Sequence, residues 1–378
     1  MRDSESVTAL ELFFDVVFVL AITQCTAYMA GNPDWTGILQ GTLILAVLWW
    51  GWVGYAWLTS VVDPEEGFVR FAIFGAMAAL LVVSLAIPEA FDDRGLLFAG
   101  AYGVFRIGQL TLFWIASSGE PELRRSILTG LVGSTVFAIT VLAIAAGTDG
   151  ALQMTLWAIA ISGDLLGPYV FGSEGWKLEP AHFAERHRLI VIIALGESIV
   201  AIGAGAEAAI GTSEVAAAVL GTAVAAAIWW LYFDVVAFVS EQRLLSAAAG
   251  RDRNEKARDV YSYLHFPMVA GIVLVALGLK KTLGDPTEAL EVETAAALYG
   301  GVALYLLAHI AVRERNVGTL SRPRLTLAVV LLAAIPLASD IASLAAVALL
   351  TAALTVLIAY ETRMYGERRS ELREQMHA

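Results

Sequence analysis

The sequence predicts an all-α integral membrane protein with about twelve transmembrane helices in two parallel six-helix repeats. Of the 378 residues, 58% are hydrophobic and 16% are charged, and the mean hydropathy is +0.71. Soluble domains contain about 45–50% apolar and about 25% charged residues. The apolar residues gather in long runs, and the basic residues gather in alternate connections between those runs.

Twelve apolar segments follow one another along the chain, each near the roughly 20 residues that cross a bilayer as a helix. They cover about 12–30, 36–62, 68–90, 96–117, 122–146, 151–171, 188–206, 214–240, 260–280, 294–312, 323–339 and 341–362. Since Ser339-Asp340 alone divides the last two, we predict a kinked hairpin there.

The distribution of basic residues tests this count. The tails and the even-numbered loops hold 20 of the 24 Lys and Arg residues, the odd-numbered loops hold 3, and Arg106 lies within the fourth segment. This asymmetry predicts a multi-pass membrane protein with both termini in the cytoplasm. A missed helix would reverse every later loop and abolish the asymmetry.

We expect four regions. They are a first six-helix half (1–171), a cytoplasmic interfacial linker (172–187), a second six-helix half (188–363) and a charged cytoplasmic tail (364–378).

A weak internal similarity suggests that the halves are repeats. Gly41 to Trp50 and Gly221 to Trp230 match at five of ten positions, including both Trp-Trp pairs. Tyr102-Gly103 and Tyr299-Gly300 also correspond. Six crossings return the chain to its starting side, so two such repeats would be parallel. Chance similarity between apolar sequences is the alternative.

Ionisable residues inside apolar segments are costly in lipid and therefore indicate functional sites. We predict six residues as an ion- or substrate-binding set: Glu11, Asp15, Arg106, Asp164, Glu197 and Asp234. Asp15 is the first choice, and its alternative role is a structural ion pair with Arg106. Glu11 lies one helical turn before Asp15, on the same face, and solvation near a helix terminus is its alternative role.

The other acids have distinctive neighbours. Glu197 follows Gly196, which predicts a helix irregularity or a close backbone approach, as at cation sites in transporters. Asp164 precedes Pro168, which predicts a kinked or discontinuous helix with free carbonyls. Asp234 lies in the inner half of its segment, where a solvated vestibule is the alternative.

The histidines of His182 to His187 do not predict a metal site. On a regular helix His187 points about 140° away from His182, so the two do not converge. We expect instead an interfacial segment from which Arg186 reaches toward the membrane surface. For His265 and His309 we expect packed residues of the bundle with satisfied hydrogen bonds. We expect no metal, no cofactor and, given the net charge of −12 and the absence of a basic patch, no nucleic acid.

Two blocks of the chain resemble the bacterial low temperature requirement A family of multi-pass membrane proteins. They are ELFFDVVFVLAI at 11–22 and HFAERHRLIVIIALGESIVAIG at 182–203. The resemblance implies that Glu11, Asp15, His182, Glu185, Arg186, His187 and Glu197 are family positions, without assigning their roles. Arg188 departs from the glycine that similar members often carry. The first block is also similar, more weakly, to the first helix of potassium channels with a Phe-Ser-Asp motif, although Phe14 replaces the serine.

These features predict a transporter or channel for a small ion or solute, with Asp15 and Glu197 as proton or cation sites. The alternatives are a membrane-embedded enzyme acting on lipid or isoprenoid substrates, and a membrane sensor or scaffold. We expect membrane lipid and the transported species as partners. The sequence leaves homo-oligomer formation open.

Overall fold

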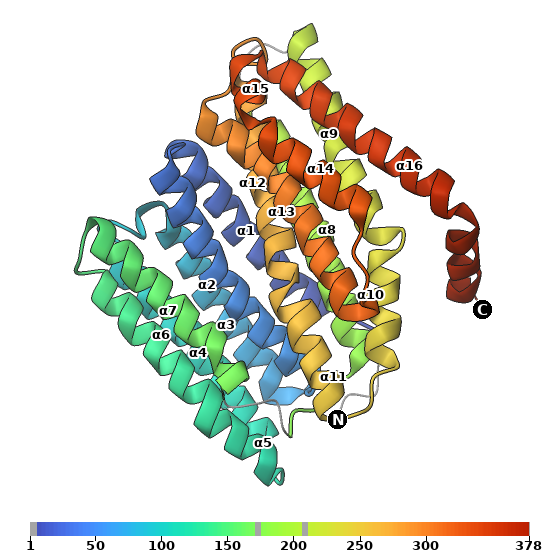
Figure 1. Cartoon of the computed structure of the whole chain (residues 1–378). Helices are drawn as coiled ribbons and strands as arrows, with labels where there is room; N and C mark the ends of the chain where they lie inside the picture. The colour runs from blue at the N-terminus through green and yellow to red at the C-terminus, as the bar shows by residue number, and fades with distance from the viewer. Residues whose placement is uncertain (1–5, 171–174, 206–210, 378) are drawn as a thin grey trace. The chain divides into compact units, whose positions relative to one another are not determined.

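The computed structural model describes residues 6–170, 175–205 and 211–377, and these residues form helices without a strand. An isolated antiparallel bridge joins Ala289 and Ala342. Figure 1 labels most of the elements, whose bounds are α1 (Ala9–Gly31), α2 (Trp35–Thr59), α3 (Gly67–Ala86), η1 (Ile87–Glu89), α4 (Gly95–Ala116), α5 (Pro121–Ser126), η2 (Ile127–Leu131), α6 (Val132–Ala145), α7 (Gly150–Val170), α8 (Pro180–Gly205), α9 (Thr212–Phe233), α10 (Val236–Leu245), α11 (Arg251–Lys256), η3 (Ala257–Tyr263), α12 (His265–Gly284), α13 (Val292–Val317), α14 (Arg322–Ala333), α15 (Ile335–Asp340) and α16 (Ser343–His377).

Within the described residues, ten helices are long and apolar enough to cross a membrane. The expected count of twelve is therefore not confirmed. The two other predicted segments are occupied by α7 and by the pair α14–α15. The former carries the polar residues Gln153 and Asp164, and α14 has 12 residues, fewer than a bilayer requires.

The chain packs as two compact units. The first comprises Met1–Met29, Thr36–His187 and Leu244–Arg258, and the second comprises Ala30–Trp35, Arg188–Arg243 and Asp259–Ala378. Each is described below by itself. The predicted halves 1–171 and 188–363 stay a prediction.

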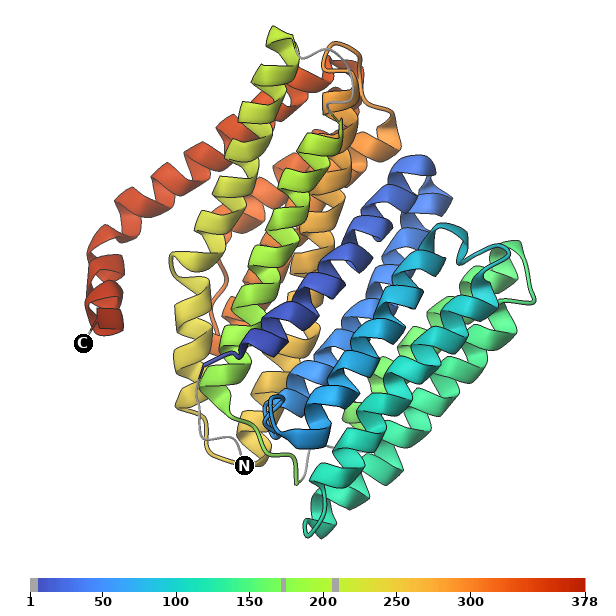
Figure 2. The same ribbon diagram turned by 180° about the vertical axis from the view of Figure 1, so that it is seen from behind.

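In the first unit α3 packs against α4, α4 against α6, and α6 against α7, and Figures 1 and 2 show these helices side by side. Aromatic contacts join the connections at one end. The ring of Phe91 stacks on Trp157 of α7 with centroids 4.6 Å apart and lies 6.3 Å from Tyr28 of α1. The Gln153 amide donates to the Phe91 carbonyl. The α3–α4 connection therefore lies with the end of α1 and the start of α7, as alternating helix directions require.

In the second unit α12 and α13 approach so closely that their backbones touch at two glycines. A Cβ atom added at Gly271 would lie 2.5 Å from the Gly301 carbonyl oxygen, and one added at Gly301 would lie 2.7 Å from the Gly271 oxygen. Small residues at such crossings are typical of membrane helices. Two further helix pairs, α13 with α14 and α9 with α16, complete the packing.

Two local expectations are wrong, a discontinuous helix at Asp164 and a close backbone approach at Gly196. Helix α7 continues through Asp164 and Pro168 to Val170. Helix α8 starts at Pro180, inside the predicted linker, and continues past Glu197. Nothing approaches within 4 Å of a Cβ built at Gly196, so this glycine permits no close contact.

The division predicted at Ser339-Asp340 is present, because α15 ends at Asp340 and α16 begins at Ser343. The eleventh predicted segment contains an additional break, since α14 ends at Ala333 and α15 restarts at Ile335 with Pro336 in its first turn. Proline is favoured in the first turn of a helix, where its missing N–H has no partner to lose.

Candidate ion-binding site

The first turn of α1 holds its own carboxylate in place. Thr8 precedes the helix, and its backbone N–H and its hydroxyl both donate to Glu11 Oε2, at 2.9 and 3.0 Å. The backbone N–H of Glu11 donates to Thr8 Oγ1 at 3.3 Å. This reciprocal pattern is a capping box, which satisfies amides that the first turn leaves without helical partners. It leaves the other oxygen of Glu11 available to face the neighbouring helix.

Two rungs connect α1 to the first two turns of α8. His182 Nε2 lies 2.9 Å from Glu11 Oε1, and Arg186 Nη2 donates to Asp15 Oδ1 at 2.9 Å. Both pairs join residues spaced by four, so successive turns of the two helices meet in register. The side chains of all four are at most 1% exposed. We call these four residues the α1–α8 cluster.

Helix α2 supplies a further donor to the α1–α8 cluster. The Trp52 indole N–H donates to Asp15 Oδ1 at 2.9 Å, and the Arg186 guanidinium lies 5.5 Å from the centre of the Trp52 ring. The ring of His187 meets Trp52 edge-on at 5.0 Å. Trp52 is buried, so bundle packing rather than a position at the membrane interface explains it. Asp15 Oδ1 thus accepts from two fixed donors.

Several buried polar atoms of the α1–α8 cluster have no hydrogen-bond partner within the described part of the chain. These are Asp15 Oδ2, His182 Nδ1, Arg186 Nε and Arg186 Nη1. Arg186 Nη1 is nevertheless 3.9 Å from Glu11 Oε1, so its charge is partly compensated. Buried polar atoms are normally bonded to protein or to ordered water. These atoms could therefore form further hydrogen bonds, either with a small polar species or after binding a proton.

The alternative role considered for Asp15, an ion pair with Arg106, is wrong. Arg106 Nη1 lies 2.6 Å from Asp164 Oδ2, and both side chains are 1% exposed. Tyr102 Oη and Thr135 Oγ1 accept from the same guanidinium, and Ser134 Oγ donates to Asp164. The carboxylate of Asp164 thus binds a guanidinium. The sequence had instead predicted a kinked or discontinuous helix with free backbone carbonyls at this position.

The second unit contains a third buried cluster. Arg324 of α14 donates twice to Glu361 of α16, from Nε and Nη2, both at 2.9 Å. Its Nη1 lies 2.7 Å from His309 Nδ1 of α13. A guanidinium can only donate, so His309 accepts at Nδ1 and carries its proton at Nε2.

His265 is a separate buried histidine of the second unit. Its Nδ1 lies 2.9 Å from the Val260 carbonyl, and Tyr232 Oη is 2.8 Å from its Nε2. Because a carbonyl only accepts, the proton is on Nδ1 and the tyrosine donates to Nε2. His265 is therefore bonded at both ring nitrogens, as the sequence led us to expect, whereas His309 Nε2 is buried without a hydrogen-bond partner among the described residues.

The three clusters differ in formal charge. Arg106 and Asp164 balance one another, and so do Arg324 and Glu361. The α1–α8 cluster contains two carboxylates and one guanidinium, and His182 adds a positive charge only when protonated. Two buried carboxylates that lie beside one guanidinium can be stabilised further by a proton on His182 or by a cation.

The remaining predicted residues lie in the second unit. Glu197 is buried in the interior of α8, and the hydroxyl of the adjacent Ser198 is buried without a hydrogen-bond partner among the described residues. Asp234 is the C-terminal cap of α9 and is half-buried.

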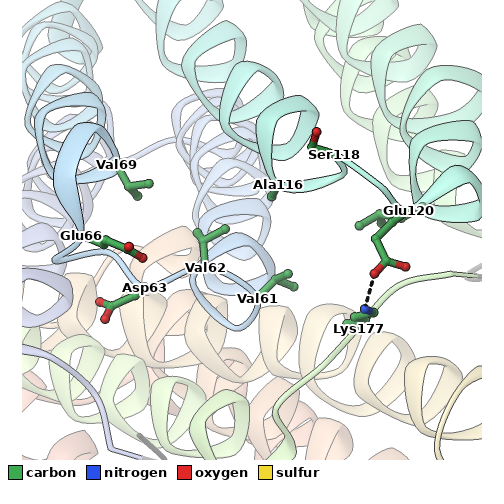
Figure 3. Close-up of a pocket in the computed structure, with 10 residues that line it drawn as sticks. Val61, Val62, Asp63, Glu66, Val69, Ala116, Ser118, Glu120 and Lys177 are labelled. Atoms are coloured by element: carbon green, nitrogen blue, oxygen red, sulfur yellow. Dashed lines mark hydrogen bonds and ion pairs between the residues drawn. The ribbon is translucent and has the colours of Figure 1, made fainter. Parts of the chain in front are cut away.

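A pocket of 260 Å³ opens at one end of the first unit (Figure 3). The α2–α3 connection contributes Asp63 and Glu66, the α4–α5 connection contributes Glu120, and the segment before α8 contributes Lys177. Figure 3 shows Lys177 reaching Glu120, at 2.6 Å. These are three even-numbered loops, so their meeting agrees with the predicted alternation of helices. None of the six predicted binding residues lines this pocket.

Sequence reasoning missed two members of the α1–α8 cluster. Arg186 was expected at the membrane surface, but its side chain is 1% exposed and bonded to Asp15. His182 was weighed as a zinc ligand, and the described residues contain no group of three or more His, Cys, Asp or Glu side chains that could hold a metal ion. The available signal was the shared spacing: Glu11 and Asp15 are four apart, and so are His182 and Arg186.

Comparison with known proteins assigns the chain to a family. The family model described as "Bacterial low temperature requirement A protein (LtrA)" matches residues 6–359. An uncharacterized protein of Rhizobium meliloti (strain 1021) is 31% identical over 313 residues, which cover 78% of this chain and 74% of the relative. No solved structure matches the chain.

Proposed function

The chain belongs to the bacterial low temperature requirement A family, and we propose that it is a membrane transporter or channel for a small ion or solute. The α1–α8 cluster is its ion-coupling site. Family membership and the ten apolar helices support a multi-pass membrane protein. The predicted cytoplasmic orientation of both termini belongs to the same proposal.

The observation that carries the proposal is the pair of buried carboxylates in the α1–α8 cluster. Glu11 and Asp15 lie beside the same arginine, Arg186, in a site that is at most 1% exposed, and Asp15 Oδ2 and His182 Nδ1 have no hydrogen-bond partner among the described residues. A membrane protein that needed only a structural cross-link there could use a single pair, as Arg106 and Asp164 do. Embedded acids are typical of proton relays and cation pathways.

The test is ion flux into proteoliposomes that contain the purified full-length chain. Vesicles enclosing the pH indicator pyranine receive a K⁺ diffusion potential through valinomycin, and proton entry is followed by fluorescence. Potassium and sodium uptake are measured in parallel with radioactive tracers. We expect flux of at least one of these ions above that of protein-free vesicles, and we expect Asp15→Asn to abolish it.

The matched control is Asp93→Asn, which makes the same chemical change at an exposed acid between α3 and α4. It should retain wild-type flux. Insertion and folding of each variant are checked by size-exclusion chromatography in detergent. Equal flux in wild type and Asp15→Asn would reject the role given to the α1–α8 cluster.

Glu197 is the coupling residue that we propose in the second unit. It is buried in α8, which at this point is a regular helix, so its role does not depend on the irregularity expected from the sequence. Glu197→Gln should reduce flux while the protein still inserts. Unchanged flux would remove Glu197 from the proposed site.

We also propose that the predicted halves 1–171 and 188–363 are parallel repeats with six crossings each. In the first, Tyr102 of α4 donates to the Val47 carbonyl of α2. In the second, Tyr305 of α13 donates to the Ile228 carbonyl of α9. These are the fourth and second predicted segments of each half, and the two acceptor positions are nearly those paired by the sequence similarity.

The clusters next to these tyrosines support the same correspondence. Four residues after Tyr102, Arg106 reaches an acid on the sixth segment, Asp164. Four residues after Tyr305, His309 reaches Arg324, which binds an acid on the twelfth segment, Glu361. This correspondence pairs Tyr102 with Tyr305 rather than with Tyr299. The Trp-Trp pairs support it less well, because Trp49 and Trp50 are buried whereas Trp229 and Trp230 are exposed.

A further inference from the structure

We propose that the coupling ion is a proton, bound at Nδ1 of His182 while its Nε2–H remains bonded to Glu11. This rests on the proposed function, since it names the ion used by the α1–α8 cluster. No comparison assigns a role to His182.

Geometry selects His182 as the group that gains and loses the proton. Its Nε2 is 2.9 Å from Glu11 Oε1, and its Nδ1 is buried without a partner among the described residues. A neutral imidazole that donates at Nε2 has a free lone pair at Nδ1. Transfer of one proton from a hydronium ion forms a new N–H bond there, breaks one O–H bond of the hydronium, leaves a water molecule and converts the ring into an imidazolium.

The carboxylate beside His182 makes that proton favourable. The charged and titratable groups that α1 and α8 place near His182 include Glu11, Asp15, Glu185, Arg186 and His187. Glu185 is half-buried and accepts from the Val7 backbone N–H. The contacts that α2 makes with this cluster include the uncharged Trp52. A positive charge on His182 is attracted to the Glu11 carboxylate, whose Oε1 is 2.9 Å from its Nε2.

The two side-chain pairs between α1 and α8 differ in whether their positive charge can change. Asp15 Oδ1 is held by Arg186 and Trp52, and an arginine does not deprotonate in proteins, so this rung is permanent. The Glu11 rung contains a histidine, the side chain that changes charge between about pH 5 and 8. The site lies within the first two turns of α1, at the predicted cytoplasmic end.

The test is nitrogen NMR of the full-length chain labelled with ¹⁵N-histidine, in detergent micelles, from about pH 5 to 8. Imidazolium and the two neutral tautomers have distinct ¹⁵N shifts. His182 is assigned by the signal missing from His182→Gln. His265 and His309 serve as internal references, because Val260 and Arg324 fix them as neutral Nδ1–H and Nε2–H tautomers.

We expect wild-type His182 to be imidazolium at neutral pH and to become neutral in Glu11→Gln at the same pH. Glu185→Gln, which removes a half-buried acid from the same turn of α8, should leave it imidazolium. A wild-type His182 that stays neutral throughout would overturn the proposal even if Glu11→Gln did not fold. So would conversion of imidazolium to the neutral ring by sodium chloride but not by choline chloride, which would identify sodium as the bound cation.

This result is independent of transport. Protonation of His182 is read without a membrane gradient, so absent flux with a protonated His182 would reject the transporter and leave the proton site in place. Flux with a permanently neutral His182 would reject the proton site and leave the transporter in place.

Discussion

His182 Nε2 and Glu11 Oε1 are 2.9 Å apart, one helical turn from the point where Arg186 meets Asp15 at the same separation. Two adjacent rungs between two helices cross-link them and also set their register. The Asp15–Arg186 pair contains an arginine, which keeps its charge. The Glu11–His182 pair contains a histidine, which is charged only when protonated. Four predictions follow from this contrast and from the packing around it.

Removing Arg186 should destabilise the protein strongly. Arg186→Met removes the guanidinium that donates to the buried Asp15 carboxylate, and breaking a buried ion pair from one side costs about 3–5 kcal/mol. The double variant Arg186→Met with Asp15→Leu should recover much of that loss. Both are measured by denaturant unfolding in detergent micelles, and a double variant no more stable than the single one would contradict the pairing.

The Arg106–Asp164 pair should act in stability rather than in flux. Asp164→Asn should lower the free energy of unfolding by an amount on the order of a few kcal/mol, because it leaves a buried guanidinium uncompensated. Flux per folded molecule should remain near wild type. A folded Asp164→Asn protein without flux would show that the Arg106–Asp164 pair takes part in transport.

The two tyrosines of the proposed repeat should be equivalent. Tyr102→Phe and Tyr305→Phe each remove a hydroxyl that donates to a backbone carbonyl on the second helix of its unit. Each should cost about 1–3 kcal/mol, because a buried acceptor loses its donor. Thermal unfolding of the two variants provides the comparison, and an effect confined to one unit would argue against equivalence.

The crossing of α12 and α13 should tolerate no added methyl group. Gly271→Ala would place a carbon 2.5 Å from the Gly301 carbonyl oxygen, which forces the helices apart at a cost of about 1–3 kcal/mol. Gly300→Ala is the matched control, since nothing lies within 4 Å of its Cβ. It should be neutral or stabilising, because alanine favours helices by about 1 kcal/mol over glycine. Equal losses in thermal stability would contradict the close crossing.

Hydropathy and charge predicted the helical class, because apolar length and the distribution of Lys and Arg report directly on the bilayer. They did not predict which charged groups meet. Arg106 was considered for Asp15, whereas Asp164 is its partner. Partner choice depends on the relative rotation and depth of helices far apart in sequence, and no local pattern encodes these.

Helix breaks were also predicted poorly. Pro168 and Gly196 suggested interruptions, but each is accommodated within a continuous helix, while Pro336 coincides with a real break. Proline and glycine permit a break, and tertiary packing decides whether one forms. Arg186 was misplaced for a related reason. A charged residue near the end of an apolar segment is predicted to be solvated, because the sequence does not show that a buried acid on another helix lies beside it.

The central claim is that Glu11, Asp15, His182 and Arg186 form an ion-coupling site. Its most direct test is pyranine-detected proton flux in proteoliposomes containing wild type, Glu11→Gln or Asp93→Asn at equal protein content. We predict proton entry in wild type and Asp93→Asn, and entry no faster than in protein-free vesicles for Glu11→Gln. Proton entry in a folded Glu11→Gln protein at the wild-type rate would contradict the claim.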